Sequence, residues 1–476
     1  MKKLFVIAFC ATLFALGAGQ ISPAEQAALD RISAASLRGN LSFLASDALE
    51  GRNTPSRGLD IAAEFIAAQF RRAGLEPVTK DGSYFQTAEY AEVTPKTADF
   101  AMTLTTGGNV LTLSSADARV RSLRALDMTD APVIDLPAAA DAPLPEIAGK
   151  IVAGDARRWG MEAPLEQLQA RKPALILLTA RARQGRGGGA GNQSYLEDAA
   201  STGAPVIRIA NADAATAVAD RKPLSLTLHV SAPAMTSAPV ENVIGVLPGS
   251  DPVLRNQYVI LSAHYDHLGT RNGQIYNGAN DNGSGTVSVI EIANALATLA
   301  PHPKRTIVFM TFFGEEEGLL GAYYYTHHPL FPLAGTVANV NLEQMGRTDD
   351  KDAARVAEFS FTGPSYSDLP GVMTSAAKQE GVGVYVKSDA DDFFARSDNY
   401  AFAEAGVVAH TAVVAYEYPD YHAFGDKWQK VDYANMAKVD RAVAAGLLSI
   451  ADAPDAPHWS DTKAAAPYRD ARRTGR

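Results

Sequence analysis

The feature that most constrains the fold is an alternation of apolar runs and helical segments in the second half of the chain. From about residue 240 onward, four runs have the length and composition of buried strands: Tyr258–Ala263, Thr306–Phe312, Thr336–Leu342 and Val407–Val414. The mostly apolar segment Gly285–Leu299 is long enough for a helix, and a final helix is expected from Val431. Apolar strands that alternate with helices are typical of sheets covered on both faces. We therefore expect an α/β fold with a mostly parallel mixed sheet flanked by helices.

The rest of the 476-residue chain divides into segments of different texture. Residues 20–96, which we assign to the same domain, open with a capping box at Ser22 and predict one helix toward Leu49 and a second over Arg57–Ala73. Between residues 97 and 238, short β-rich runs alternate with Ala-, Asp- and Pro-rich loops, which indicates an inserted domain. Residues 239–453 complete the α/β domain, and residues 454–476 are predicted to be a flexible tail.

The first nineteen residues have the pattern of a secretory signal peptide. Lys2 and Lys3 precede an apolar run over residues 4–16, and small residues follow at 17–19. The run is short for a membrane span, so we expect an exported protein, periplasmic or extracellular, without stable membrane insertion after cleavage. Cleavage would remove Cys10, the only cysteine, so disulfides could not stabilise the mature chain. The formal net charge of −10 argues against nucleic-acid binding, which needs clustered Lys and Arg.

Metal-competent side chains follow the predicted strands, where one edge of a sheet can bring them together. They are His264, Asp281, Glu315, Glu316, Glu343 and His422. Ligands of open α/β sheets bind beyond the carboxyl ends of the strands, and nitrogen and oxygen donors suit a catalytic zinc site. Two zinc ions that share one carboxylate and one water would each need two further ligands, and a spare glutamate could then act as a base. Asp266 is the candidate partner for the second ring nitrogen of His264.

These residues lie in motifs that resemble those of the co-catalytic zinc peptidases, a family that includes secreted bacterial leucyl aminopeptidases, aminopeptidase Y and glutamate carboxypeptidase. The matching segments are Glu241–Ser250, Ser262–Gly269, Asn277–Gly285, Phe312–Gly321, Asn341–Arg347, Ser397-Asp398 and Pro419–His422, with Phe43–Arg52 and Gly74-Leu75 near the N-terminus. The resemblance covers most of residues 30–450. It implies a zinc exopeptidase fold with an inserted protease-associated domain, whose marks are Ile147–Val152 and Gly203–Ile207.

The resemblance also implies a role for each candidate residue. One zinc ion is expected at His264 and Glu343, and the other at Glu316 and His422. Asp281 would bridge the two ions, and the peptide bond after it, Asp281-Asn282, would be cis. Peptide bonds would be hydrolysed by a hydroxide that bridges the metals.

Two catalytic roles and two departures from the family follow from the same motifs. Glu315 is expected to be the general base, and Tyr421 to stabilise the oxyanion. Glu343 stands where the family usually has aspartate, and Asn399 replaces a frequent histidine. The carboxylate of Glu343 is kept, so these changes concern substrate preference rather than metal binding.

The most direct interpretation is a secreted two-zinc aminopeptidase that acts on short peptides. A carboxypeptidase or dipeptidase, or glutaminyl cyclase-like amide chemistry, is the alternative on the same fold. A binding module without activity is disfavoured because every ligand type is present. The chain has no G-x-S-x-G and no H-E-x-x-H, which disfavours a serine hydrolase and a single-zinc endopeptidase of that type. The oligomeric state is left open.

The remaining histidines and one arginine cluster have simpler interpretations. We interpret His267, His302, His327, His328 and His458 as structural or solvated, and His410 as a satisfied core histidine. Arg181, Arg183 and Arg186, in a Gly-rich stretch of the insert, could reach a substrate carboxylate, which would favour a carboxypeptidase.

Overall fold

The computed structural model describes residues 20–94, 96–138, 142–160, 162–180, 193–196 and 203–474. The expected signal peptide and the arginines at 181, 183 and 186 lie outside these ranges. The chain forms two compact units, one made of residues up to Ala88 and from Val240 onward, the other of Glu89–Pro239. Of the helices in the described ranges, none has the length and apolar character that a membrane crossing requires.

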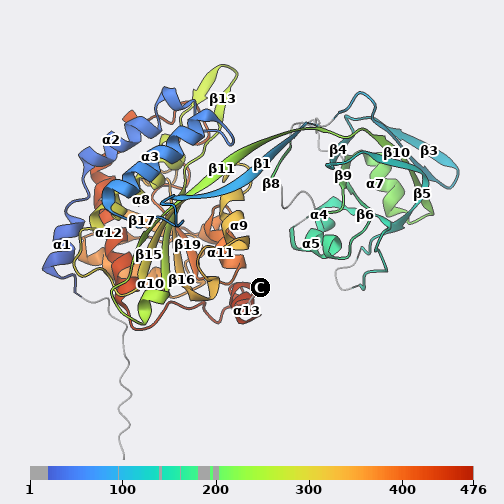
Figure 1. Cartoon of the computed structure of the whole chain (residues 1–476). Helices are drawn as coiled ribbons and strands as arrows, with labels where there is room; N and C mark the ends of the chain where they lie inside the picture. Colours follow the sequence, from blue (N-terminus) through green and yellow to red (C-terminus); the bar gives the residue numbers. More distant parts are fainter. Residues whose placement is uncertain are drawn as a thin grey trace, which may run out of the picture. The chain divides into compact units, whose positions relative to one another are not determined.

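The first unit is built on a mixed sheet, and the expected α/β fold is confirmed (Figure 1). Across the sheet the strands run β18-β17-β19-β16-β12-β15-β11-β1-β8, of which β8 and parts of β1 and β11 belong to the residues of the second unit. Their bounds are β1 Phe85–Thr94, β8 Gln193–Leu196, β11 Ala234–Leu247, β12 Tyr258–His264, β15 Thr306–Phe312, β16 Thr336–Glu343, β17 Glu358–Phe361, β18 Gly383–Val384 and β19 Ala409–Val413. The central strands β15, β12, β16 and β19 are parallel, whereas β11 and β17 pair antiparallel.

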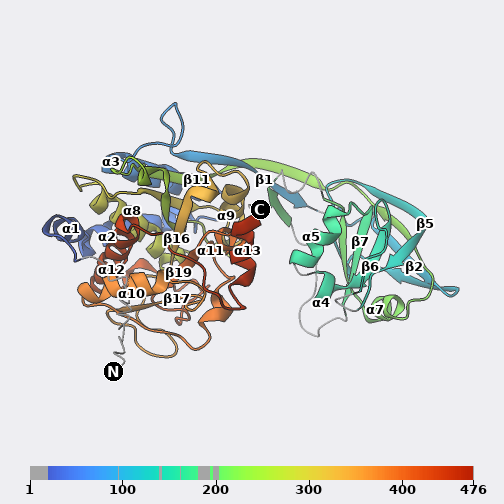
Figure 2. The same cartoon turned by 90° about the horizontal axis from the view of Figure 1, so that it is seen from below.

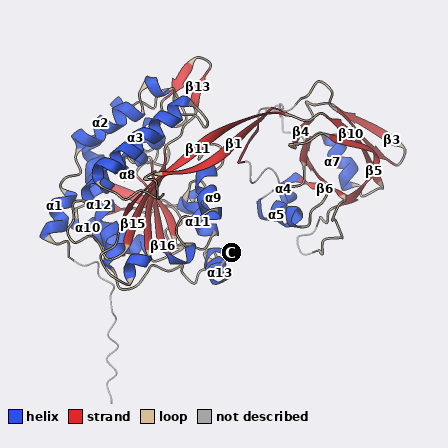
Figure 3. Cartoon of the chain, in the orientation of Figure 1, coloured by secondary structure: helices blue, strands red, loops and turns tan. Residues whose placement is uncertain are grey.

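The central strands are apolar and buried because helices cover both faces of this sheet (Figures 1 and 3). On one side lie α8 (Gly285–Leu296) and α12 (Tyr433–Asp452), and on the other lie α9 (Leu320–His327) and α11 (Asn399–Glu404). Helix α10 (Leu369–Gln379) packs against α12. Because the central strands are parallel, their carboxyl ends lie together at one edge of the sheet.

The N-terminal helices differ in part from the prediction. The expected single helix toward Leu49 is two helices, α1 (Pro23–Leu29) and α2 (Ala34–Leu44), because Ser33 caps a new helix by accepting from the Ser36 amide. The capping box at Ser22 is present. Helix α3 has the predicted bounds, Arg57–Ala73, and closes at Gly74 with φ +82°.

The second unit has its own eight-stranded sheet, in the order β3-β2-β10-β5-β6-β7-β9-β4. The strands are β2 Ala101–Thr106, β3 Asn109–Leu113, β4 Ala118–Arg121, β5 Leu126–Asp135, β6 Ile151–Asp155, β7 Leu175–Ala180, β9 Val206–Ala210 and β10 Leu224–Val230. The helices are α4 Ala156–Trp159, α5 Glu162–Ala170 and α7 Ala212–Ala219. Leucines and isoleucines of these strands form a core of its own, as a separate compact unit requires.

The C-terminal segment corrects the prediction of a flexible tail. Residues Ala466–Thr474 form helix α13, which lies beside α11 (Figure 2). Tyr468 packs its ring against Trp459 and Phe394 at centroid distances of 5.3 Å. Composition suggested fraying, but these aromatic contacts hold the segment on the first unit.

Candidate metal centre

The candidate ligands meet at the edge where the parallel strands end. His264 and Glu343 are the last residues of β12 and β16, and Glu315 and Glu316 follow β15 by a few residues. Asp281 lies in an irregular turn, Ala279–Ser284, that leads into α8. The structure thus brings together residues from four separate chain segments, and the loop after β19 adds His422.

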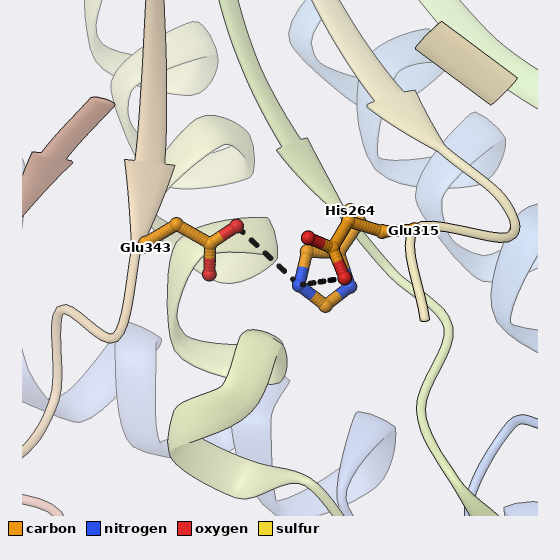
Figure 4. A group of neighbouring side chains, drawn as sticks. All are labelled: His264, Glu315 and Glu343. Carbon is orange, nitrogen blue, oxygen red and sulfur yellow. Dashed lines mark ion pairs between the residues drawn. The ribbon is translucent and has the colours of Figure 1, made fainter. Parts of the chain in front are cut away.

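One cluster surrounds the imidazole of His264. Its Nε2 lies 3.4 Å from Glu343 Oε1 and 3.8 Å from Glu315 Oε2, and both carboxylates face the ring (Figure 4). His264 is 1% exposed. Ser397 donates a 2.5 Å hydrogen bond to Glu343 Oε1, which orients that carboxylate. One histidine and two carboxylates thus bring their ligand atoms within 4.8 Å of one another in largely buried surroundings.

A second cluster lies around Glu316. Its Oε1 is 2.8 Å from His267 Nδ1 and 3.3 Å from His422 Nε2. His267 is 1% exposed and shares this cluster with Asp281 and Glu316. Our interpretation of His267 as a structural or solvated side chain is wrong as regards solvation. His267 lies within the motif Ser262–Gly269, but the resemblance gave it no role. Nothing in the sequence therefore distinguished it from a structural or surface histidine.

Asp281 belongs to the second cluster and also faces the first. Its Oδ1 is 3.5 Å from His264 Nε2, and its Oδ2 is 3.0 Å from His422 Nε2. The Asp281-Asn282 peptide bond is cis, as the resemblance implies. The two oxygens of one carboxylate thus face different histidines, which is the arrangement that a bridging ligand needs.

Two buried residues that the sequence did not single out hold this loop. Asp426 accepts hydrogen bonds from the amides of Asn280 (3.0 Å) and Asp281 (3.1 Å). Arg52, 1% exposed, donates to the carbonyl oxygens of Tyr265, Asn277 and Gly278, and so ties the segment after β12 to the loop before Asp281. The only sequence signal for either residue was that Arg52 ends the segment Phe43–Arg52, which resembles the family.

The two accessory residues named from the sequence are both at the site. His264 Nδ1 lies 3.4 Å from Asp266 Oδ1, and the Asp266 carboxylate accepts from the backbone amide of Glu315. Asp266 therefore contacts both the histidine and the loop that carries the glutamates. Tyr421 is 46% exposed and stacks on His422, with ring centroids 4.0 Å apart.

The neighbouring glutamates have different electrostatic surroundings. Burial raises the pKa of Glu315 well above its usual value, although the charge of His264 opposes this. Burial also acts on Glu316, but contacts with His267 and His422 outweigh it and lower the pKa to about 2. The contacts of His422 with Asp281 and Glu316 outweigh its own burial and raise its pKa to about 10. Glu317 is exposed.

Several buried polar atoms at this site fit a bound cation. Asp281 Oδ2, Glu316 Oε1 and both ring nitrogens of His267 have no hydrogen-bond partner. Glu316 Oε1 lies 2.8 Å from His267 Nδ1, and Asp281 Oδ2 lies 3.0 Å from His422 Nε2. Buried polar atoms are rarely left without a partner. Carboxylate oxygens and imidazole nitrogens at this spacing suit zinc, and a dication would neutralise the gathered carboxylates. The donor set therefore fits a metal centre.

Other histidines are accounted for without a metal. His410 is fully buried, and its ring nitrogens contact Ser367 Oγ (2.6 Å) and the Thr362 carbonyl oxygen (2.9 Å). The interpretation as a satisfied core histidine is confirmed.

Comparison with known proteins supports a peptidase. A model of peptidase family M28 matches residues 242–447. A probable zinc metalloprotease from Leptosphaeria maculans is 27% identical over 265 residues, covering 46% of this chain and 59% of that protein. Aminopeptidase YwaD of Bacillus subtilis is 33% identical over 150 residues, covering 31% of this chain and 30% of that protein. The chain therefore spans less than two thirds of the length of these curated relatives.

A solved structure agrees at the level of the fold. The aminopeptidase from Aneurinibacillus sp. strain AM-1 has a TM-score of 0.53 and 17% identity, covering 91% of this chain and 97% of that chain. Fold, site and family match point to one class: the segment 242–447 is similar to peptidase family M28, the kind of enzyme that the sequence motifs predict.

Proposed function

We propose that the protein is a zinc-dependent aminopeptidase that uses two metal ions. The observation that carries the proposal is the pair of buried histidine–carboxylate clusters, with Asp281 in the second and also facing the first. Two relatives, an aminopeptidase and a probable zinc metalloprotease, support the same activity.

The proposed ligands follow the geometry of the clusters. His264 and Glu343 would hold one zinc ion, Glu316 and His422 the other, and Asp281 both. When bound, the two ions would polarise the substrate carbonyl and lower the pKa of water. The longer side chain of Glu343 reaches the cluster and keeps its carboxylate there.

Glu315 is the proposed general base. Its carboxylate lies 3.8 Å from His264 Nε2 and so borders the reaction space. Glu315 would take the proton from the attacking water and deliver it to the leaving nitrogen of the peptide. Burial raises the pKa of Glu315, which favours its holding the proton between the two transfers. Asp266 holds the Glu315 amide and Tyr421 would contact the developing oxyanion.

An acidic site also favours a substrate with a free amine. Asp281, Glu315, Glu316 and Glu343 place four carboxylates around the reaction space. Bound zinc ions would neutralise the three carboxylates that are proposed ligands, which leaves Glu315 to attract a substrate ammonium group and to repel a substrate carboxylate at the same place. This supports the aminopeptidase over the carboxypeptidase alternative.

The test is hydrolysis of matched peptides. Leu-Leu and its N-acetylated form are compared with the zinc-loaded protein and after chelation. We expect cleavage of the free peptide, much slower cleavage of the acetylated peptide, and loss of both after chelation. Faster cleavage of the acetylated peptide would favour the carboxypeptidase, and unchanged activity after chelation would contradict a metal enzyme.

We also propose that the second unit is a protease-associated domain and that the chain is exported. The β-rich unit Glu89–Pro239 and the motifs Ile147–Val152 and Gly203–Ile207 support the first statement. The Lys2-Lys3 pair and the apolar run after it support the second. N-terminal sequencing of the protein from the periplasm and medium tests export, since we expect a start near residue 20.

A further inference from the structure

A pocket borders the cluster around His264, and one of its lining residues is an arginine without a carboxylate partner among the residues that the structure describes. His264, Glu343, Phe393, Arg396, Tyr416 and Tyr421 are among its lining residues. Within the described part of the chain, Arg396 is the only lysine or arginine that lines it. Its guanidinium lies over the ring of Phe393, 4.6 Å from the centroid.

Arg396 differs from the other cations near this edge in having no carboxylate partner. Arg347 pairs with Asp349 (2.5 Å) and Asp420 (2.9 Å). Lys387 likewise pairs with two aspartates, at 2.5 Å and 3.1 Å. No carboxylate of the described residues lies within ion-pair distance of Arg396. Its charge is therefore available to a ligand in the pocket.

The surroundings of Arg396 suit a planar anion. The guanidinium offers paired N–H donors that match the two oxygens of a carboxylate. The contact with Phe393 restricts the guanidinium plane and still leaves its donor edge free. Phe393 and Tyr416 also give the pocket an apolar wall for the rest of the ligand.

We propose that Arg396 binds a carboxylate of the peptide substrate and makes carboxylate-bearing short peptides the preferred substrates. The inference rests on the proposed function, since it assigns a subsite next to the same centre. Glu315, which is not a proposed zinc ligand, would attract the amino end of the substrate, and Arg396 would bind an acidic group further along the peptide. That group is either the free C-terminus of a dipeptide or an acidic side chain.

The experiment compares substrates that differ only in that carboxylate. Leu-Leu is paired with Leu-Leu amide, and the p-nitroanilide of glutamate with that of glutamine. Each pair is assayed with wild type, Arg396→Gln and Arg396→Lys. Arg271→Gln is the matched control, because Arg271 is also exposed and lies over an aromatic ring, 5.8 Å from the centroid of Tyr276, but does not line the pocket.

We expect Arg396→Gln to lower kcat/KM about tenfold for the carboxylate member of one pair, chiefly through KM. The neutral member should change by less than about twofold, Arg396→Lys should recover part of the loss, and Arg271→Gln should match wild type. The pair that responds identifies the source of the carboxylate. Equal effects of Arg396→Gln on both members of both pairs, or no effect, would overturn the inference. The proposed function would still stand in that case if the wild-type protein cleaves the neutral members, Leu-Leu amide and the glutamine p-nitroanilide. A wild-type protein that cleaves none of the four substrates would overturn both.

Discussion

At the scale of single residues, Glu315 and Glu316 show how position decides the role of identical side chains. Glu316 contacts His267 and His422, which lower its pKa to about 2 and favour the ionised carboxylate that the proposed ligand role needs. Glu315 lies in the other cluster, where burial raises its pKa. The exposed Glu317 belongs to neither cluster.

The variant Glu315→Gln tests the proposed base. Glutamine keeps the size of the side chain but cannot accept a proton, so kcat should fall by about 10²–10⁴-fold. Zinc content should stay at the wild-type value, which separates chemistry from metal binding. Retention of more than about a tenth of the wild-type kcat would contradict the assignment, given the loss expected of a missing base.

His267→Gln tests whether His267 supports the second cluster. Its Nδ1 lies 2.8 Å from Glu316 Oε1, and residues that orient ligands typically contribute about 10–100-fold to metal affinity. We expect weaker zinc binding by that factor in a titration against a competing chelator. His302→Gln is the control, because the His302 ring contacts the Pro248 carbonyl oxygen and the residue belongs to neither cluster. Equal zinc affinity of the two variants would show that His267 is only a packing residue.

At the scale of elements, the strands were predictable and the contacts between distant segments were not. Strand β15 has the predicted bounds, Thr306–Phe312, because an apolar run of that length has few other ways to be buried. Arg52 reaches carbonyl groups more than 200 positions away in sequence, and Asp426 reaches a loop 145 positions away. No local pattern encodes such pairings, so the fold has to be known before they appear.

A pairing between two helices predicts how stability depends on pH. In α12, Asp440 accepts a 2.7 Å hydrogen bond from Ser288 of α8, and burial raises its pKa to about 8 from 3.8. Between these two pH values the folded chain binds more protons at this group than the unfolded chain. The protonated Asp440 carboxyl group therefore stabilises the fold at low pH. This contribution to the free energy of unfolding is lost as the pH rises, by up to about 1.4 kcal/mol per pH unit.

Asp440→Asn removes this titration. The unfolding free energy of the variant relative to wild type should increase between about pH 5 and 7, whatever its offset at low pH, because asparagine does not ionise. Denaturant unfolding at several pH values measures the difference. Asp455→Asn, at an exposed position, is the control and should follow wild type. A pH-independent difference for Asp440→Asn would contradict the buried, protonated carboxyl group.

At the scale of the whole molecule, the chain combines a unit that contains the segment similar to peptidase family M28 with a second compact unit inserted between Ala88 and Val240. The composition of the sequence changes near residue 97, within about ten positions of the boundary at Ala88. The two positions differ because β1 continues beyond the boundary to Thr94. The C-terminal helix α13 was missed because aromatic packing, which composition does not record, determines its position.

The most direct test of the central claim is the metal content of the whole protein. After saturation with zinc and removal of free metal, elemental analysis should give two zinc ions per chain. Glu316→Gln should hold one, since it loses a ligand of one cluster only, and Glu317→Gln should still hold two. A wild-type protein that binds no more than one ion at saturation would contradict the two-metal centre.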